Sequence, residues 1–437
     1  MSSVAAAPPA GRPPRALRQP AYLLLWATML SANGARWAFT MLASYVAFVL
    51  THSAAWVGLT VFALQMPAIA LAPVAGVVAD RVSRVRMLVW AIGVSFVAAV
   101  AALVLFELGR LTPLLLVLVA LVLGIGTTVQ STAQNTLLPQ TVPPAALFEA
   151  VALQGTARQG AEFFGPALAT AVLALFGRTA ALSVVALLFA LGLVPCLFLS
   201  SHERRADRAS ARSSEPRPGP WTMVKEGARY VAGPAALVPT MVLISLHCLL
   251  TMAYMGMLPG LATDGGMGGN AAYGGLMTTV GLGAAAGTLG IALVGRSMHP
   301  GRLLWVLSLL SGVGVAALGA VRGVVALELA ALVVGGATAS FMSIALLRIQ
   351  RATRDERMRG RVMSLYLMLA GGAMALGNWG YGALAGVVPI HLLPILSGGL
   401  FIAIVLTAPT LFGSVRAIYG EMPQPQARHE IAAAAKA

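Results

Sequence analysis

Long apolar runs separated by short polar segments dominate the chain. Counting about 20 apolar residues as one membrane crossing predicts twelve spans. They lie roughly at 21–50, 55–79, 87–106, 112–134, 150–176, 179–200, 236–260, 271–295, 302–321, 324–347, 361–387 and 391–413. An even number of crossings returns the chain to the side on which it began. The pattern therefore predicts an all-α membrane protein of twelve transmembrane helices with both termini on one face.

The spans divide into two groups of six. A shift of 211 residues aligns Thr40-Met41 with Thr251-Met252, as expected of parallel repeats. Between the groups, residues 201–220 are charged and rich in Ser and Pro, which is typical of a disordered linker. The expected parts are a disordered cytoplasmic tail (1–20), an N-terminal six-helix bundle (21–200), a cytoplasmic linker with a helix on the membrane surface (201–235), a C-terminal six-helix bundle (236–413) and a second cytoplasmic tail (414–437).

Composition and charge support this topology. The chain is 58% hydrophobic and 10% charged, which is unusual for a domain that folds in water. Its net charge of +15 does not indicate a nucleic-acid partner, because the basic residues lie between spans rather than on one element. Of 29 Lys and Arg, 24 fall on one side of the predicted topology. That side should be the cytoplasm, in a bacterial-type inner membrane, with lipid around the spans. The first 20 residues lack a short apolar core, so no signal peptide is expected.

Among the charged residues inside predicted spans, three are candidates for chemistry, because an ionised group there is costly unless it faces a cavity or a partner. Arg36 belongs to a polar stripe at helical spacing with Asn33 and Thr40. Arg158 and Glu162 are one turn apart and can pair. We expect Glu162 to take up and release a proton while Arg36 or Arg158 competes for its charge. A static buried ion pair is the alternative.

Other polar and aromatic side chains in the spans suit a large amphipathic or weakly charged substrate. With the stripe of the first span, the residues expected in a substrate cavity are Asn33, Thr40, Gln65, Gln130, Gln134, His247, Thr251, Tyr254, Ser340, Asn378 and Tyr381. A lone histidine such as His247 is more often a hydrogen-bonded core residue, and many of the others could equally be helix contacts.

Residues 76–86, GVVADRVSRVR, form a basic turn between the second and third spans. This turn resembles the G-x-x-x-D-R-x-G-R-[KR] loop of the major facilitator superfamily, with Ser83 in place of the second Gly. The resemblance implies the major facilitator fold and a cytoplasmic gate in which Asp80 meets the start of span eleven near Arg361. Asp355 and Glu356 would pair with Arg84 or Arg86 across the two halves. The gate residues so implied are Gly76, Asp80, Arg81, Arg84, Asp355, Glu356 and Arg361.

Further stretches, including 138–169, KEGARYV from Lys225 and the run from Tyr273, resemble exporters of enterobactin and macrolides. That branch implies export of a drug-like compound or a siderophore, with drug resistance as one outcome. Gly165-Pro166 resembles the end of the antiporter signature of span five. Ala161, Thr156, Ala169 and Thr170 stand where that signature has other residues.

The positions of the two lysines limit which energy source the protein can use. An ATP site needs Gly-Lys-Ser/Thr, and the two lysines, Lys225 and Lys436, lie in no such motif. Transport should therefore draw on an ion gradient, the substrate gradient or a separate ATPase subunit. Of these we expect a secondary active transporter that uses protons, acting as a monomer on a small-molecule substrate, with no cofactor or metal. Cys196 and Cys248 are read as packing residues. An uptake or facilitative carrier and a transporter-like membrane sensor remain the alternatives, whereas an enzyme is not expected.

Overall fold

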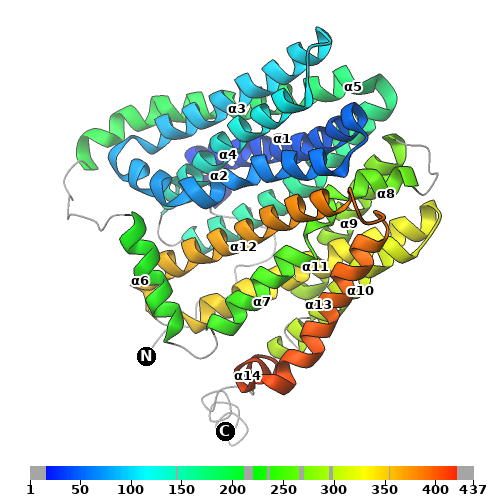
Figure 1. Cartoon of the computed structure of the whole chain (residues 1–437). Coiled ribbons are helices and arrows are strands. Elements are labelled where there is room, and N and C mark those ends of the chain that lie inside the picture. The colour runs from blue at the N-terminus through cyan, green and yellow to red at the C-terminus, as the bar shows by residue number, and fades with distance from the viewer. Residues whose placement is uncertain are drawn as a thin grey trace, which may run out of the picture.

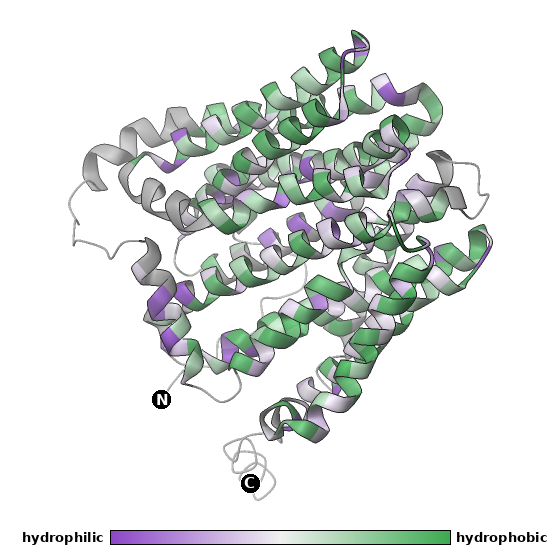
Figure 2. Cartoon of the chain, viewed as in Figure 1, coloured by the Kyte–Doolittle hydropathy of each residue, from purple (hydrophilic) through white to green (hydrophobic). Residues whose placement is uncertain are grey.

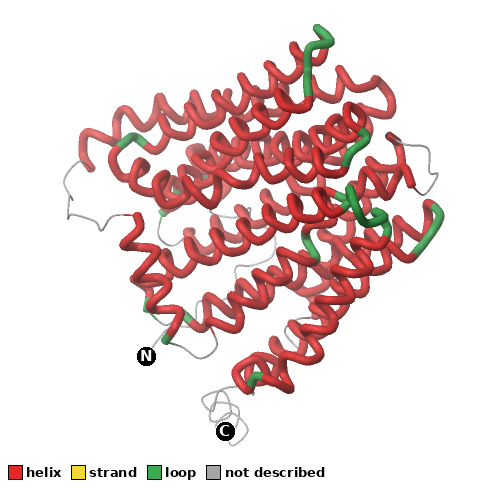
Figure 3. Tube along the Cα trace, viewed as in Figure 1, coloured by secondary structure: helices red, strands yellow, loops and turns green. Residues whose placement is uncertain are grey.

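A computed structural model describes residues 16–143, 146–210, 220–233, 237–264, 270–294, 299–353 and 355–420 of the chain. All regular structure in these ranges is helical (Figure 3). The elements are η1 (Ala16–Arg18), α1 (Pro20–Thr51), α2 (Ala54–Arg81), α3 (Arg84–Glu107), α4 (Pro113–Thr141), α5 (Leu147–Ser210), α6 (Pro220–Ala232), α7 (Leu237–Leu250), η3 (Ala253–Gly256), α8 (Leu258–Asp264), α9 (Asn270–Val294), α10 (Pro300–Ala320), α11 (Val324–Ala352), α12 (Glu356–Leu384), α13 (Leu392–Leu411) and α14 (Gly413–Gly420).

Ten of the described helical stretches are long and apolar enough to cross a membrane. One of them, Leu153–Leu199, has 47 residues and contains Gly177, whose φ of 84° and ψ of −174° take the backbone out of the helix. A positive φ costs glycine little, so the chain can reverse there. The count of twelve crossings stays a prediction. It requires this stretch to cross twice and the 32-residue α1 to be added to the ten.

Two bundles lie side by side in Figure 1, α1–α5 above and α7–α13 below, and α2 runs along α12. The helix α6 lies at one end of the molecule and α8 at the other, so these are called the α6 end and the α8 end. Hydrophobic residues cover most of the helical surface, and hydrophilic residues gather on α6 and at helix ends (Figure 2). Such a surface suits a bilayer rather than water.

Glycines allow the closest helix contacts. A Cβ at Gly165 of α5 would collide with the carbonyl oxygen of Gly34 in α1, and one at Gly283 of α9 would collide with that of Leu332 in α11. In lipid, small residues let backbones approach in this way. Gly371 has open space around its missing side chain. Close packing therefore requires glycine at Gly165 and Gly283, but does not explain Gly371.

Two expected boundaries differ in the structure. The span expected at 236–260 is divided into α7, η3 and α8, and the helix α5 continues to Ser210, into the segment expected to be linker. The first difference has a physical cause, since the Asn378 side chain accepts a hydrogen bond from the Gly256 N–H (3.0 Å). A backbone donor released by the break is thereby satisfied inside the bundle.

Candidate functional site

The polar stripe on α1 becomes more exposed toward the α6 end. Ser44 and Thr40 are buried, with 1% and 6% of their surface exposed, whereas Arg36 and Asn33 are half-buried. The Thr40 and Ser44 hydroxyls donate to carbonyl oxygens one turn earlier, at 2.8 Å each. These bonds satisfy the two hydroxyls within the helix, so the stripe leaves only its α6-end half available to a ligand.

The helix α9 covers the other half of the α1 stripe, toward the α8 end. The Tyr273 hydroxyl donates to the carbonyl oxygen of Met41 at 3.3 Å, and its ring stacks on Tyr45 with centroids 6.3 Å apart. Because α1 and α9 belong to different bundles, these contacts join the two halves of the chain at the α8 end.

The face of α5 that carries Thr170 and Glu162 also becomes more exposed toward the α6 end. At the α8 end, the Thr170 hydroxyl donates to the Gly274 carbonyl oxygen of α9 (3.3 Å). On the same helical face, Glu162 is half-buried, and Arg158 and Gly155 are exposed. The bundles therefore contact each other at Thr170, and the described residues of this face become more exposed toward the α6 end.

Arg36, Arg158 and Glu162 form one charged cluster. The three charges lie close enough to influence each other electrostatically, as the sequence pattern predicts. No ion pair shorter than 4.0 Å joins them within the described part of the chain. The Arg36 guanidinium instead lies over the Trp37 ring, 4.6 Å from its centroid. A closed static pair is therefore not the arrangement in this conformation.

The charged cluster faces the second bundle. Glu162 acts electrostatically on the Tyr254 hydroxyl of η3, and Arg158 acts on that of Tyr366 in α12. Both tyrosines belong to the C-terminal bundle and are buried, at 1% and 7% exposure. The cluster consequently lies at the interface between the bundles.

The hydrophobic cores confirm the asymmetry between the two ends. One core runs through the N-terminal bundle and continues into Tyr254, Leu258, Tyr273 and Leu327 of the C-terminal bundle. A second core, which includes Val231 of α6, is built only from residues of the second half. The bundles thus share a core near the α8 end, while the C-terminal bundle has a separate core near the α6 end.

The three glutamines expected in the cavity belong to the N-terminal bundle. Gln65, Gln130 and Gln134 are buried, with 9%, 1% and 3% exposure. Neither Oε1 of Gln130 nor Nε2 of Gln134 has a hydrogen-bond partner among the described residues. Because buried amide groups are rarely left unpaired, these two atoms mark a place where a water or a substrate group would bind.

His247 and Thr251 lie in a packed part of the C-terminal bundle. The His247 ring stacks on Phe341 at 3.9 Å and meets Phe401 at 5.5 Å between centroids, and Nδ1 lies 2.9 Å from the Thr251 hydroxyl. Both residues are 0% exposed. In this conformation they pack between helices and line no open surface.

The remaining cavity candidates make helix contacts. Asn378 bonds the Gly256 N–H as described above, and its amide also donates to the Met374 carbonyl oxygen (2.8 Å). Ser340 is 2% exposed, at the close contact between α9 and α11. Tyr381 is half-buried and packs against both cores. Of these, only Tyr381 lies where the bundles meet with part of its surface uncovered.

At the α6 end, the structure pairs Arg361 with a residue that the sequence did not single out. Its Nη1 lies 2.6 Å from Oε2 of Glu226 in α6, with 26% and 35% of the two side chains exposed. Arg84 is half-buried, and Asp355 is exposed and donates its N–H to the Tyr230 hydroxyl (3.3 Å). The surroundings of Gly76 and the side chains of Asp80, Arg81 and Glu356 lie outside what the structure describes.

Ser83, which stands where the loop pattern has its second Gly, has a structural role at the start of α3. Its hydroxyl accepts a hydrogen bond from the Arg86 N–H (3.4 Å) and so caps the start of α3. Serine is a favoured cap because it satisfies a free backbone donor. Within the described residues, no group of three or more His, Cys, Asp or Glu could hold a metal ion.

Comparisons with known proteins agree with this architecture. A family model described as transmembrane secretion effector matches residues 13–427. The MFS-type transporter y4rN of Sinorhizobium fredii, itself uncharacterized, is 27% identical over 380 residues, covering 84% of this chain and 87% of the relative.

Solved transporter structures share the fold. The nucleoside transporter NupG superposes with a TM-score of 0.68 at 16% identity, covering 92% of this chain and 100% of its own. A POT family transporter in complex with 5-aminolevulinic acid gives 0.68 at 12% identity, covering 90% and 96%. At these identities the likeness concerns the fold alone.

Proposed function

Because the chain belongs to the transmembrane secretion effector family of major facilitator transporters, we propose that it is a proton-coupled exporter of a hydrophobic or amphipathic small molecule. Family membership makes it a multi-pass membrane transporter. Export, the proton and the substrate class are the proposal. Within the superfamily we propose the branch of enterobactin and macrolide exporters, and therefore a drug-like compound or a siderophore as substrate.

The observation that carries the proposal is the charged cluster of Arg36, Arg158 and Glu162 at the interface of the bundles. A carboxylate near two guanidiniums, none of them locked in an ion pair, can exchange a proton as its exposure to water changes. All three residues belong to the N-terminal bundle, so a rocking motion of one bundle against the other changes their exposure and their distance from Tyr254 and Tyr366, not the distances among them. Glu162 would then carry the proton, and Arg36 and Arg158 would stabilise its charged form.

The exposure gradients favour alternating access. Contacts of Tyr273 and Thr170 close the α8 end, whereas Arg158 and Gly155 are uncovered toward the α6 end. We propose that the α6 end faces the cytoplasm, because the basic loops gather there in the expected topology. A substrate would enter from that side, next to Glu162 and the unpaired amides of Gln130 and Gln134.

The test is transport in liposomes that hold the purified full-length protein. A panel of amphipathic fluorescent dyes of positive, neutral and negative charge serves as substrate probes, and dye and proton movement are recorded together. The wild type should move at least one dye against a proton flux. In Glu162→Gln, proton movement should fall to the level of empty liposomes, because an amide cannot carry the proton.

Glu107→Gln is the matched control, because Glu107 is an exposed carboxylate at the far end of α3 and accepts its hydrogen bond from Thr179. It should retain wild-type coupling. Coupled transport that persists in Glu162→Gln would reject the proton site. Dye and protons that travel in the same direction would replace the exporter with an uptake carrier.

A further inference from the structure

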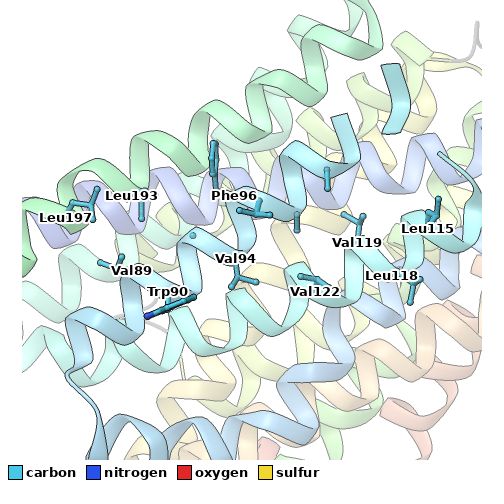
Figure 4. Close-up of a pocket in the computed structure, with 14 residues that line it drawn as sticks. Val89, Trp90, Val94, Phe96, Leu115, Leu118, Val119, Val122, Leu193 and Leu197 are labelled. Carbon is cyan, nitrogen blue, oxygen red and sulfur yellow. The ribbon is translucent and has the colours of Figure 1, made fainter. Parts of the chain in front are cut away.

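A groove on the outer surface of the N-terminal bundle has no role in the proposed transport path. It has a volume of about 700 Å³ and is walled by α3, α4 and the second part of α5 (Figure 4). Its lining consists of apolar side chains and one glycine. Trp90 and Val97 are 74% and 64% exposed, so the groove opens outward, on the surface that faces the bilayer.

One helical stripe of α3 forms the floor of the groove, and the cationic side chain of Arg86 lies at the end of that stripe. Trp90, Gly93, Val97 and Ala101 line the groove at spacings of three and four residues, and Arg86 lies one turn before Trp90 on the same stripe. No atom lies within 4 Å of the position that a Cβ would take at Gly93. The missing side chain therefore gives the groove part of its depth.

The helix α3, which forms the floor of the groove, carries basic residues at one end and an acidic residue at the other. Arg86 is exposed and Arg84 half-buried at the α6 end of α3, whereas the exposed acid Glu107 ends the same helix on the other side. An anionic group is favoured at the first end and repelled at the second. Trp90, one turn inside Arg86, is a residue type enriched where lipid headgroups meet acyl chains.

The length of the stripe matches one leaflet. From Val89 to Ala101 the helix rises about 18 Å at about 1.5 Å per residue, against about 15 Å for half of a hydrocarbon core. We propose that the groove binds one anionic phospholipid, with an acyl chain over Gly93 and its phosphate at Arg86. A transported substrate fits less well, because the indole N–H of Trp90 is the one polar side-chain group among the lining residues.

The test is native mass spectrometry of the full-length protein, released from detergent with equal amounts of phosphatidylglycerol and phosphatidylcholine that carry the same acyl chains. The wild type should retain phosphatidylglycerol with about fivefold preference, equivalent to about 1 kcal/mol for one Arg near an anionic headgroup. Gly93→Leu should lose the bound lipid, because the new side chain fills the groove. Arg86→Gln should keep a lipid and lose the preference.

Gly399→Leu is the matched control, since Gly399 is exposed on α13 and also has no atom within 4 Å of its Cβ position. It should bind lipid as the wild type does. Equal binding of both lipids by the wild type, or unchanged binding in Gly93→Leu, would overturn the proposal. A dimer that dissociates in Gly93→Leu would assign the groove to a second copy of the chain instead.

Discussion

Arg36, Arg158 and Glu162 can be found from the sequence because a charge inside an apolar span is too costly to be incidental. The same reasoning selects His247, yet this residue packs between Phe341 and Phe401. The difference lies in what covers each side chain. Spacing along a helix shows which residues share a face, but not which helix packs against that face.

Gly165 offers a stability test at the residue scale. Gly165→Ala places a methyl group against the Gly34 carbonyl oxygen, so α1 and α5 must separate. Overpacking of this kind costs about 1–3 kcal/mol, and we expect a lower thermal unfolding midpoint for the purified protein. Gly290→Ala is the control, because its methyl group meets no atom within 4 Å. Equal midpoints for both variants would show that the close contact is not required.

The elements differ in how well the sequence predicts them. Long apolar runs predict α3, α4 and α10 because each run is uninterrupted between polar loops. The interruption of this span at η3 comes with a tertiary hydrogen bond between Gly256, at the end of η3, and Asn378, 122 residues apart, which no local pattern reveals. The aligned Thr40 and Thr251 therefore lie in unlike surroundings, one within an unbroken helix and one just after a helix end.

The helix α6 is joined to α12 by the Glu226–Arg361 ion pair. A partly exposed pair contributes about 0.2–1 kcal/mol, so Glu226→Ala should speed amide hydrogen exchange in Pro220–Ala232 by up to about fivefold. The unfolding midpoint of the whole protein should change little. Lys225→Ala, at an exposed neighbouring position, should leave the exchange as in the wild type. Unchanged exchange in Glu226→Ala would mean that the other contacts of α6, Val231 in the core and Tyr230 with Asp355, dock the helix without the ion pair.

At the scale of the whole molecule, the fold follows from hydropathy and from the loop motif between α2 and α3, and the family match agrees with it. The conformation does not follow from either, because both alternating states bury the same spans. It becomes visible only in contacts between the bundles, such as Tyr273 with Met41. These contacts close the α8 end and leave the charged cluster accessible from the α6 end.

The proposed alternating-access mechanism requires the α8 end to open in every transport cycle. A Cβ at Gly274 would lie 3.0 Å from Cβ of Thr170, so a disulfide, whose Cβ atoms lie about 3.5–4.5 Å apart, needs the two helices to separate by only about 0.5 Å. We would measure dye transport by Thr170→Cys with Gly274→Cys, with Cys196 and Cys248 replaced by Ser and each single cysteine as control. The account predicts that oxidation stops transport in the double variant only and that a reductant restores it. Full transport by the cross-linked protein would contradict it.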